Sequence, residues 1–212
     1  MRLSLRSFPA LLVPALALGV AGVAAAQTTS AAGTSAAAPA AVPTAAPAAM
    51  PEAPAVGAAA PDFTMPAAGA SGATAPVSLA ALRGKVVVLA FYPKDKTSGC
   101  TAELHKFRDE YGALFGPKAG SDVVVVPVSA DGLASHEAWA SEDKFPFALA
   151  SDSALAVAER YGSRRPAAAF ANRTVFVIDR QGRVAYRDLK FNALSEDAYK
   201  QLAAAVRQAA GA

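Results

Sequence analysis

The chain has 212 residues with 20 basic and 17 acidic side chains, a formal charge of +3 at pH 7. Two of the basic residues, Arg2 and Arg6, lie in a segment that we expect to be removed, which leaves 18 basic and 17 acidic residues. A charge this close to zero gives no electrostatic basis for binding nucleic acid or an acidic membrane surface. About 150 residues look globular, which suits one domain with a sizeable core.

The N-terminus has the order of features of a secretory signal. Arg2 and Arg6 precede an apolar run at 11–23, and three alanines at 24–26 form a small-residue cleavage site. The apolar run falls short of the roughly 20 residues that cross a bilayer. We therefore expect residues 1–26 to be cleaved on export to the bacterial periplasm or another extracytoplasmic compartment, with no stable membrane insertion afterwards.

Residues 27–56 are nearly all Ala, Pro, Thr and Ser. This composition has too few large apolar side chains to offset the entropy lost on ordering, so we expect a disordered Ala/Pro-rich linker. The folded domain is then expected to occupy residues 57–212.

The chain has a single cysteine, Cys100. Exported proteins that use cysteines for stability carry them in pairs, and an intramolecular disulfide is impossible here. Cys100 is therefore either an inert core residue or a residue kept for its reactivity.

The first elements of the domain alternate between strand and helix. The continuous apolar run 86–92 predicts a central strand covered on both faces. A helix is expected to begin at Thr97 or Ser98, with one of them as its cap. Its apolar stripe is spaced four, three, four and three residues apart, at Cys100, Leu104, Phe107, Tyr111 and Leu114.

The rest of the domain continues this alternation. A second buried strand at 123–129 should run parallel to the first, because a helix connects them, although Pro127 cannot donate to a sheet ladder. The later pattern predicts helices at 133–142 and 152–161, with a short apolar segment at 147–150 between them. Two β-rich runs, at 173–179 and 183–189, should form an antiparallel pair of strands, and a final helix should start near Ser195. The domain is thus predicted to be α/β, a central mixed sheet flanked by helices.

The predicted helix places Cys100 in its first turn. Backbone N–H groups without intrahelical partners and the helix dipole favour an anion there. A thiolate is the anion that they would stabilise.

The residues around Cys100 resemble a known family. Pro93, Thr97 and Cys100 match the Pro-x-x-x-Thr-x-x-Cys signature of peroxiredoxins, directly after a strand. Four segments in order are similar to the bacterioferritin comigratory protein, or Q-type, subgroup: PDFTMP from 61, FYPKDKTSGCTAE from 91, SHEAW from 135 and NRTVFVID from 172. The resemblance covers about residues 57–190 and implies a thioredoxin-like fold.

The resemblance also implies roles for five residues. Cys100 would be the peroxidatic cysteine, Thr97 would hydrogen-bond the sulfur and the bound peroxide, and Pro93 would shield the thiolate from water. Arg173 would approach the sulfur, favour the thiolate and hold the peroxide oxygens. Glu103 matches an acidic position of the subgroup and is counted, with Thr97 and Arg173, among the residues expected to bind substrate.

One departure from the subgroup affects the mechanism. Many Q-type members carry a resolving cysteine five residues after the peroxidatic one, and this chain has His105 there. Five helical residues rotate the side chain about 140° away from Cys100, so we expect a solvated or partly packed histidine and no general base. His136 has no ligand partner in the sequence. We therefore expect no metal and no cofactor.

The reaction implied by the resemblance is reduction of hydrogen peroxide or an organic hydroperoxide through a Cys100 sulfenic acid. An external thiol, from a thioredoxin-like protein, a glutaredoxin or a small molecule, would complete the cycle, with the protein as a monomer or dimer. An exported oxidoreductase with Cys-x-x-Cys is excluded because position 97 is threonine. The alternative left open is a non-catalytic redox sensor or binding module.

The first prediction concerns export. The intact mass of the exported protein should correspond to a chain beginning at Gln27, because the charged, apolar and small-residue segments occur in the order that signal peptidase requires. Retention of residues 1–26 in the exported protein would contradict this expectation.

Overall fold

The computed structural model describes residues 51–116 and 122–211. The expected signal segment and most of the expected linker lie outside these residues. Residues 51–56, the end of the expected linker, form no helix or strand. The carbonyl groups of Ala53 and Pro54 accept hydrogen bonds from Arg187 at 2.7 and 3.1 Å. This short stretch therefore contacts the domain.

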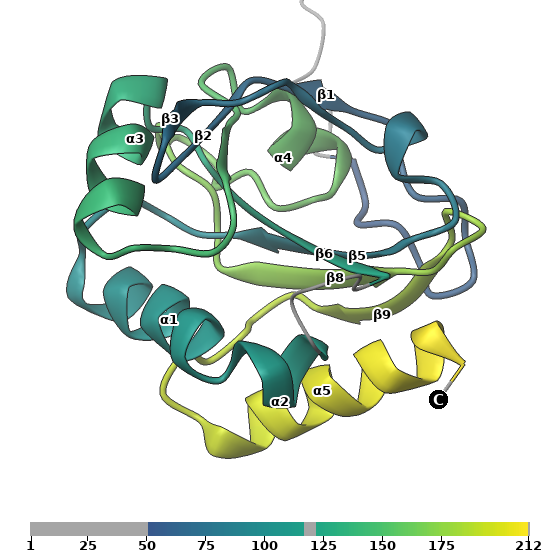
Figure 1. Cartoon of the computed structure of the whole chain (residues 1–212). Helices are drawn as coiled ribbons and strands as arrows, with labels where there is room; N and C mark the ends of the chain where they lie inside the picture. Colours follow the sequence, from purple (N-terminus) through teal and green to yellow (C-terminus); the bar gives the residue numbers. More distant parts are fainter. Residues whose placement is uncertain (1–50, 117–121, 212) are drawn as a thin grey trace, which may run out of the picture. The chain divides into compact units, whose positions relative to one another are not determined.

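The centre of the domain is a mixed sheet (Figure 1). Its strands are β2 (Ala67–Gly69), β3 (Gly72–Ala73), β5 (Val86–Phe91), β6 (Val123–Ser129), β7 (Leu149–Ser151), β8 (Thr174–Ile178) and β9 (Val184–Asp188). The spatial order is β3-β2-β7-β6-β5-β8-β9. A separate antiparallel pair joins β1 (Thr64–Met65) and β4 (Val77–Ser78). The sequence analysis did not predict the strands between residues 64 and 78.

β5 is the central strand that its composition predicted. All six of its residues are buried, and it pairs parallel with β6 and antiparallel with β8. Its even-numbered residues pack into one core and its odd-numbered residues into the other, as expected for a strand with two covered faces. The predicted parallel and antiparallel pairings are confirmed.

Pro127 fits inside β6 because of the side on which its nitrogen lies. Hydrogen bonds from Val86 to Asp122 and from Tyr92 to Val128 show that even-numbered residues of β6 bond to β5. The nitrogen of Pro127 therefore faces the other neighbour, β7, whose pairing with β6 is at Val128 and Ser129. The missing N–H costs no ladder bond at this point.

Helices cover both faces of the sheet: α1 (Ser98–Asp109), α2 (Tyr111–Phe115), α3 (Leu133–Glu142), α4 (Ala156–Arg160) and α5 (Glu196–Ala210), with a short 3-10 helix at Ala80–Leu82. Figure 1 shows α1, α2 and α5 on one face and α4 on the other. No described helix has the length and apolar character needed to cross a membrane.

Two predicted helices are shorter than expected. The stripe from Cys100 to Leu114 is divided between α1 and α2, because Glu110 leaves helical geometry at φ −105° and ψ 22°. The helix predicted at 152–161 begins only at Ala156. Asp152 instead accepts a hydrogen bond from the Ala158 N–H at 2.7 Å, and Leu155 has a left-handed φ of 56°. The final helix begins as predicted, with the Ser195 hydroxyl accepting from the Ala198 N–H.

The topology brings three chain segments to one edge of the sheet. β5 and β6 are parallel, so the loops that follow them, at 92–97 and 130–132, leave from the same edge. β8 runs antiparallel to β5 and pairs Thr174 with Phe91, so β8 begins at this edge as well. Arg173 therefore lies beside the start of α1.

Candidate active site

Cys100 lies in the first turn of α1 and is fully buried. The first intrahelical bond runs from the Thr101 N–H to the Thr97 carbonyl at 2.8 Å, so the N–H groups of residues 98–100 precede the bonded ladder. These groups and the helix dipole favour an anionic sulfur. The structure thus places the cysteine where the sequence predicted it.

Arg173 makes a direct contact with the cysteine. Its Nη2 donates to Cys100 Sγ at 3.2 Å, and its Nη1 donates to Oε2 of Glu103. Gly99 makes room for this arrangement, because a Cβ at that position would lie 3.2 Å from Arg173 Nη2. The guanidinium lies where the resemblance to peroxiredoxins placed it, and it can stabilise a thiolate.

Glu103 is buried against the guanidinium. Burial raises the pKa of Glu103 to about 7, although the charge and hydrogen bond of Arg173 oppose this shift. Burial also works against the charge on Arg173, but Glu103 and Cys100 together raise the pKa of the guanidinium above its ordinary value. Arg173 is therefore positively charged at neutral pH. Glu103 is fully buried, and its Oε2 holds Nη1 of Arg173.

The hydrogen bond expected from Thr97 to the sulfur is not formed. Thr97 is the N-terminal cap residue of α1, but its hydroxyl donates to the Lys94 carbonyl at 3.0 Å and caps no helical N–H. A hydroxyl has one hydrogen, so Thr97 can meet a ligand here as an acceptor. Pro93 is half-buried in the same loop, two residues after Phe91, the last residue of β5.

His105 is partly packed, as predicted, and has a partner that the sequence did not reveal. Its Nε2 lies 3.0 Å from Oδ2 of Asp143, and its ring packs edge-on against Phe145. The same Asp143 oxygen accepts from Trp139 Nε1 at 2.5 Å, and the Asp143 carbonyl accepts from Arg108. Asp143 therefore ties α1 to the end of α3.

His136, expected to lack a ligand partner, is fully buried with Nδ1 2.9 Å from Oδ2 of Asp95. No role was expected for Asp95 or for its hydrogen-bond partners Tyr92, Ser135 and His136. Asp95 lies between Pro93 and Thr97, and His136 lies in the SHEAW segment, so both were within the resembling motifs. Within residues 51–116 and 122–211, no group of three or more His, Cys, Asp or Glu side chains is placed to hold a metal ion.

Comparison with known proteins agrees with this geometry. Residues 56–187 match the AhpC/TSA family. This chain belongs to that family. It is 41% identical over 112 residues to the putative peroxiredoxin bcp of Coxiella burnetii, covering 50% of this chain and 72% of that protein. It is also 41% identical over 113 residues to the chloroplastic peroxiredoxin Q of Triticum aestivum, covering 52% of this chain and about half, 49%, of that relative.

Solved structures show the same fold. The peroxidoxin BcpB of Mycobacterium tuberculosis superposes with a TM-score of 0.62 at 28% identity, covering 73% of this chain and 97% of that one. The AhpC structure of Enterococcus faecalis superposes with a TM-score of 0.62 at 23% identity, covering 72% and 90% of the two chains, which bears on the fold alone. The predicted thioredoxin-like peroxiredoxin fold is thereby confirmed for this AhpC/TSA family member.

Arg173→Ala should slow alkylation of Cys100 at neutral pH severalfold, because it removes the positive charge in contact with the sulfur. The second-order rate of alkylation by iodoacetamide measures this effect. Arg180→Ala is the matched control, since Arg180 pairs with Asp122 beyond the far end of β8. An unchanged alkylation rate in Arg173→Ala would show that the guanidinium does not support the thiolate.

His105→Ala should lower the free energy of unfolding by about 1 kcal/mol, the usual net contribution of one hydrogen bond. The rate of peroxide reduction should stay within about twofold of that of the unaltered chain, since His105 contacts Asp143 and not the sulfur. Urea unfolding and peroxide consumption measure the two effects. A large loss of rate without a change in stability would give His105 a direct chemical role.

Proposed function

We propose that this chain is a one-cysteine peroxiredoxin that reduces hydrogen peroxide or organic hydroperoxides with electrons from an external thiol. The observation that carries the proposal is the 3.2 Å contact between Arg173 Nη2 and the Cys100 sulfur at the start of α1. A buried thiol in contact with a guanidinium and a helix N-terminus is the arrangement expected of a reactive nucleophile, not of an inert core cysteine.

The proposed first step is attack of the Cys100 thiolate on the terminal oxygen of the hydroperoxide. The S–O bond forms as the O–O bond breaks, so the sulfur is oxidised to sulfenic acid and the peroxide is reduced. The leaving hydroxide or alkoxide takes up a proton and departs as water or an alcohol. Arg173 would stabilise the negative charge that develops on the leaving oxygen.

The proposed roles of the other site residues follow from their contacts. Thr97 would accept a hydrogen bond from the peroxide O–H, since its own hydrogen is held by Lys94. Glu103 would position Arg173, because its carboxylate holds Nη1 while Nη2 contacts the sulfur. Pro93 would limit access of water to the thiolate from the loop side.

The second half of the cycle needs another molecule. Cys100 is the single cysteine of the chain, so an external thiol must condense with the sulfenic acid, release water and form a mixed disulfide. A second thiol then releases the Cys100 thiolate and forms the product disulfide. A thioredoxin-like protein, a glutaredoxin or a small thiol would fill this role.

We also propose that the mature protein acts outside the cytoplasm. The support is the secretory pattern of residues 1–26, followed by the Ala/Pro-rich stretch. A cysteine kept single in an oxidising compartment avoids internal disulfides and leaves the thiol available for peroxide.

One equivalent of peroxide should convert the protein to a sulfenic acid without an intramolecular disulfide. Mass spectrometry should show a gain of one oxygen at Cys100 that a sulfenic-acid reagent traps, and excess peroxide should drive it to sulfinic acid. Turnover should require added thiol and should be lost in Cys100→Ser.

Two outcomes would contradict this mechanism. Quantitative conversion to a dimer linked through Cys100 of two chains would replace external resolution by intermolecular resolution. Stoichiometric oxidation without turnover in the presence of small or protein thiols would favour a redox sensor.

A further inference from the structure

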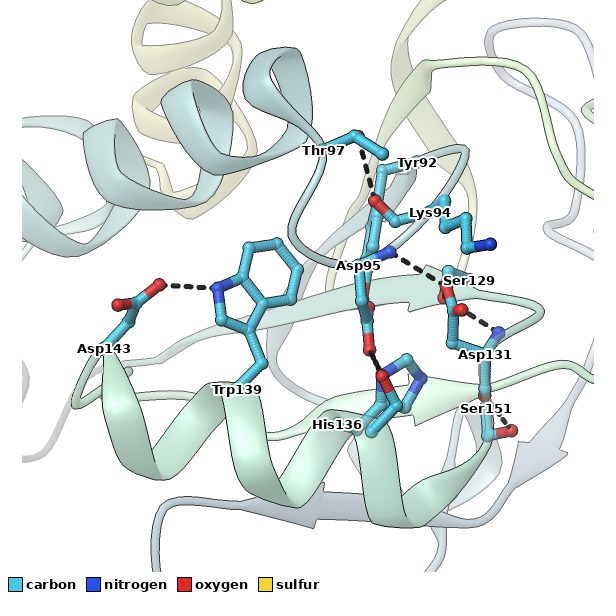
Figure 2. A network of polar contacts seen from close by, with 11 residues as sticks. Tyr92, Lys94, Asp95, Thr97, Ser129, Asp131, His136, Trp139, Asp143 and Ser151 are labelled. Atoms are coloured by element: carbon cyan, nitrogen blue, oxygen red, sulfur yellow. Dashed lines mark hydrogen bonds and ion pairs between the residues drawn. The ribbon is translucent and has the colours of Figure 1, made fainter.

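A buried hydrogen-bond network holds the loop between β5 and α1 (Figure 2). Its centre is Asp95, which is 7% exposed. Asp95 Oδ1 lies 2.7 Å from the Tyr92 hydroxyl, and Oδ2 lies 2.7 Å from the Ser135 hydroxyl and 2.9 Å from Nδ1 of His136. Ser135 and His136 belong to α3, so the network connects the active-site loop to a helix on a different part of the chain.

The ionisation of Asp95 determines the direction of these bonds. Burial works against its charge, but hydrogen bonds from His136, Ser135 and Tyr92 and the proximity of His136 hold the pKa of Asp95 below its ordinary value. A carboxylate accepts hydrogen bonds and donates none, so all three neighbours must donate. His136 therefore carries a proton on Nδ1. Its buried Nε2 has no hydrogen-bond partner within the described part of the chain.

A second carboxylate holds the backbone of the same loop. The Asp95 N–H donates to Oδ2 of Asp131 at 2.9 Å. Asp131 is itself fixed by Ser129, whose hydroxyl donates to the same oxygen at 2.9 Å, and by Ser151, whose hydroxyl donates to the Asp131 carbonyl at 2.7 Å. Figure 2 shows Asp95 between these residues and His136. The loop is thus fastened to the ends of β6 and β7 as well as to α3.

The loop keeps a conformation that would not persist without such support. Lys96, directly after Asp95, has a left-handed φ of 57°. A non-glycine residue in this region costs of order 1 kcal/mol or more and is stable only where its surroundings impose it. The next residue, Thr97, occupies the N-cap position of α1, and its hydroxyl donates to the Lys94 carbonyl. The position of Thr97, and of the helix start at Cys100, therefore depends on how Asp95 is held.

We propose that Asp95 and His136 are positioning residues for the peroxide reaction. They hold the loop at residues 93–97 so that Pro93, Thr97 and the first N–H groups of α1 surround the Cys100 sulfur in one geometry. Neither residue is required to touch the peroxide. This inference rests on the proposed peroxidase function, because its readout is the rate of peroxide reduction.

The test compares two reactions of the same sulfur. Peroxide attack needs the pocket geometry, whereas alkylation by iodoacetamide needs only that the Cys100 thiolate, fully buried in this structure, becomes exposed. Both second-order rates are measured at a pH above the alkylation midpoint for the unaltered chain, Asp95→Ala, His136→Ala and His136→Asn. The asparagine variant retains an N–H donor near the position of Nδ1. Asp179→Ala is the control: Asp179 Oδ1 also accepts two hydrogen bonds, but from the turn after β8 at the opposite end of the sheet.

The ratio of the peroxide rate to the alkylation rate should fall roughly tenfold or more in Asp95→Ala and His136→Ala, because small misplacements of reacting groups are costly. It should largely recover in His136→Asn and stay unchanged in Asp179→Ala. Urea unfolding identifies variants that are folded. An unchanged ratio in folded Asp95→Ala or His136→Ala would overturn the proposal and leave the network a purely structural one.

Milder variants decide the question if both alanine variants fail to fold. Ser135→Ala and Tyr92→Phe each remove one donor to Asp95 and leave little empty volume. The ratio should then fall severalfold in each, and an unchanged ratio in both would overturn the proposal. The rate at which the unaltered chain reacts with peroxide tests the proposed function separately. Absence of any reaction would contradict both proposals. A reaction with peroxide, combined with an unchanged ratio of peroxide rate to alkylation rate in the variants, would contradict only the positioning role of Asp95 and His136.

Discussion

The antiparallel pairing of β5 with β8 determines where the positive charge of the active site lies. Phe91 is opposite Thr174, the first residue of β8, so Arg173, directly before β8, lies next to the loop that leaves β5. From there the guanidinium reaches both the Cys100 sulfur and the Glu103 carboxylate. A slip of this pairing by one residue would exchange the two faces of the strand and remove Arg173 from the sulfur. The register of the sheet is therefore a condition for the chemistry.

Two buried carboxylates near the cysteine illustrate how the number of donors controls ionisation. Asp95 receives three side-chain hydrogen bonds, and its pKa is lowered despite burial. Glu103 receives one side-chain hydrogen bond, from Arg173, while its Oε1 has no partner within residues 51–116 and 122–211, and burial raises its pKa to about 7. Burying a charge is unfavourable unless enough donors replace water. One carboxylate thus holds the loop and the other holds the guanidinium.

His105 lies five residues after Cys100, at the position where the resemblance to the Q-type subgroup implies a resolving cysteine in many members. His105 hydrogen-bonds Asp143, which also holds Trp139 and Arg108. Where a second cysteine could trap the oxidised sulfur, this chain has a contact that joins α1 to α3. In the proposed cycle the sulfenic acid would react with a thiol of another molecule, and Cys100, fully buried in this structure, would have to become accessible to that thiol. Under the proposed function, His105 in place of a second cysteine leaves the reduction of Cys100 to an external thiol.

The sequence by itself determined the elements whose patterns are local. Residue periodicity and short-range hydrogen bonding predicted four features: the apolar run of β5, the parallel β6, the β8–β9 pair and the cap of α5 at Ser195. The motif residues Cys100, Thr97 and Arg173 followed from the family resemblance. The strands between residues 64 and 78 were missed, because two- and three-residue strands rich in Ala and Gly carry no periodic signal.

Only the tertiary structure decided that Asp95 meets His136 and that His105 meets Asp143, because these pairs are separated by 41 and 38 residues along the chain. Such partners come together through strand order and helix packing, which a linear pattern of residues does not encode.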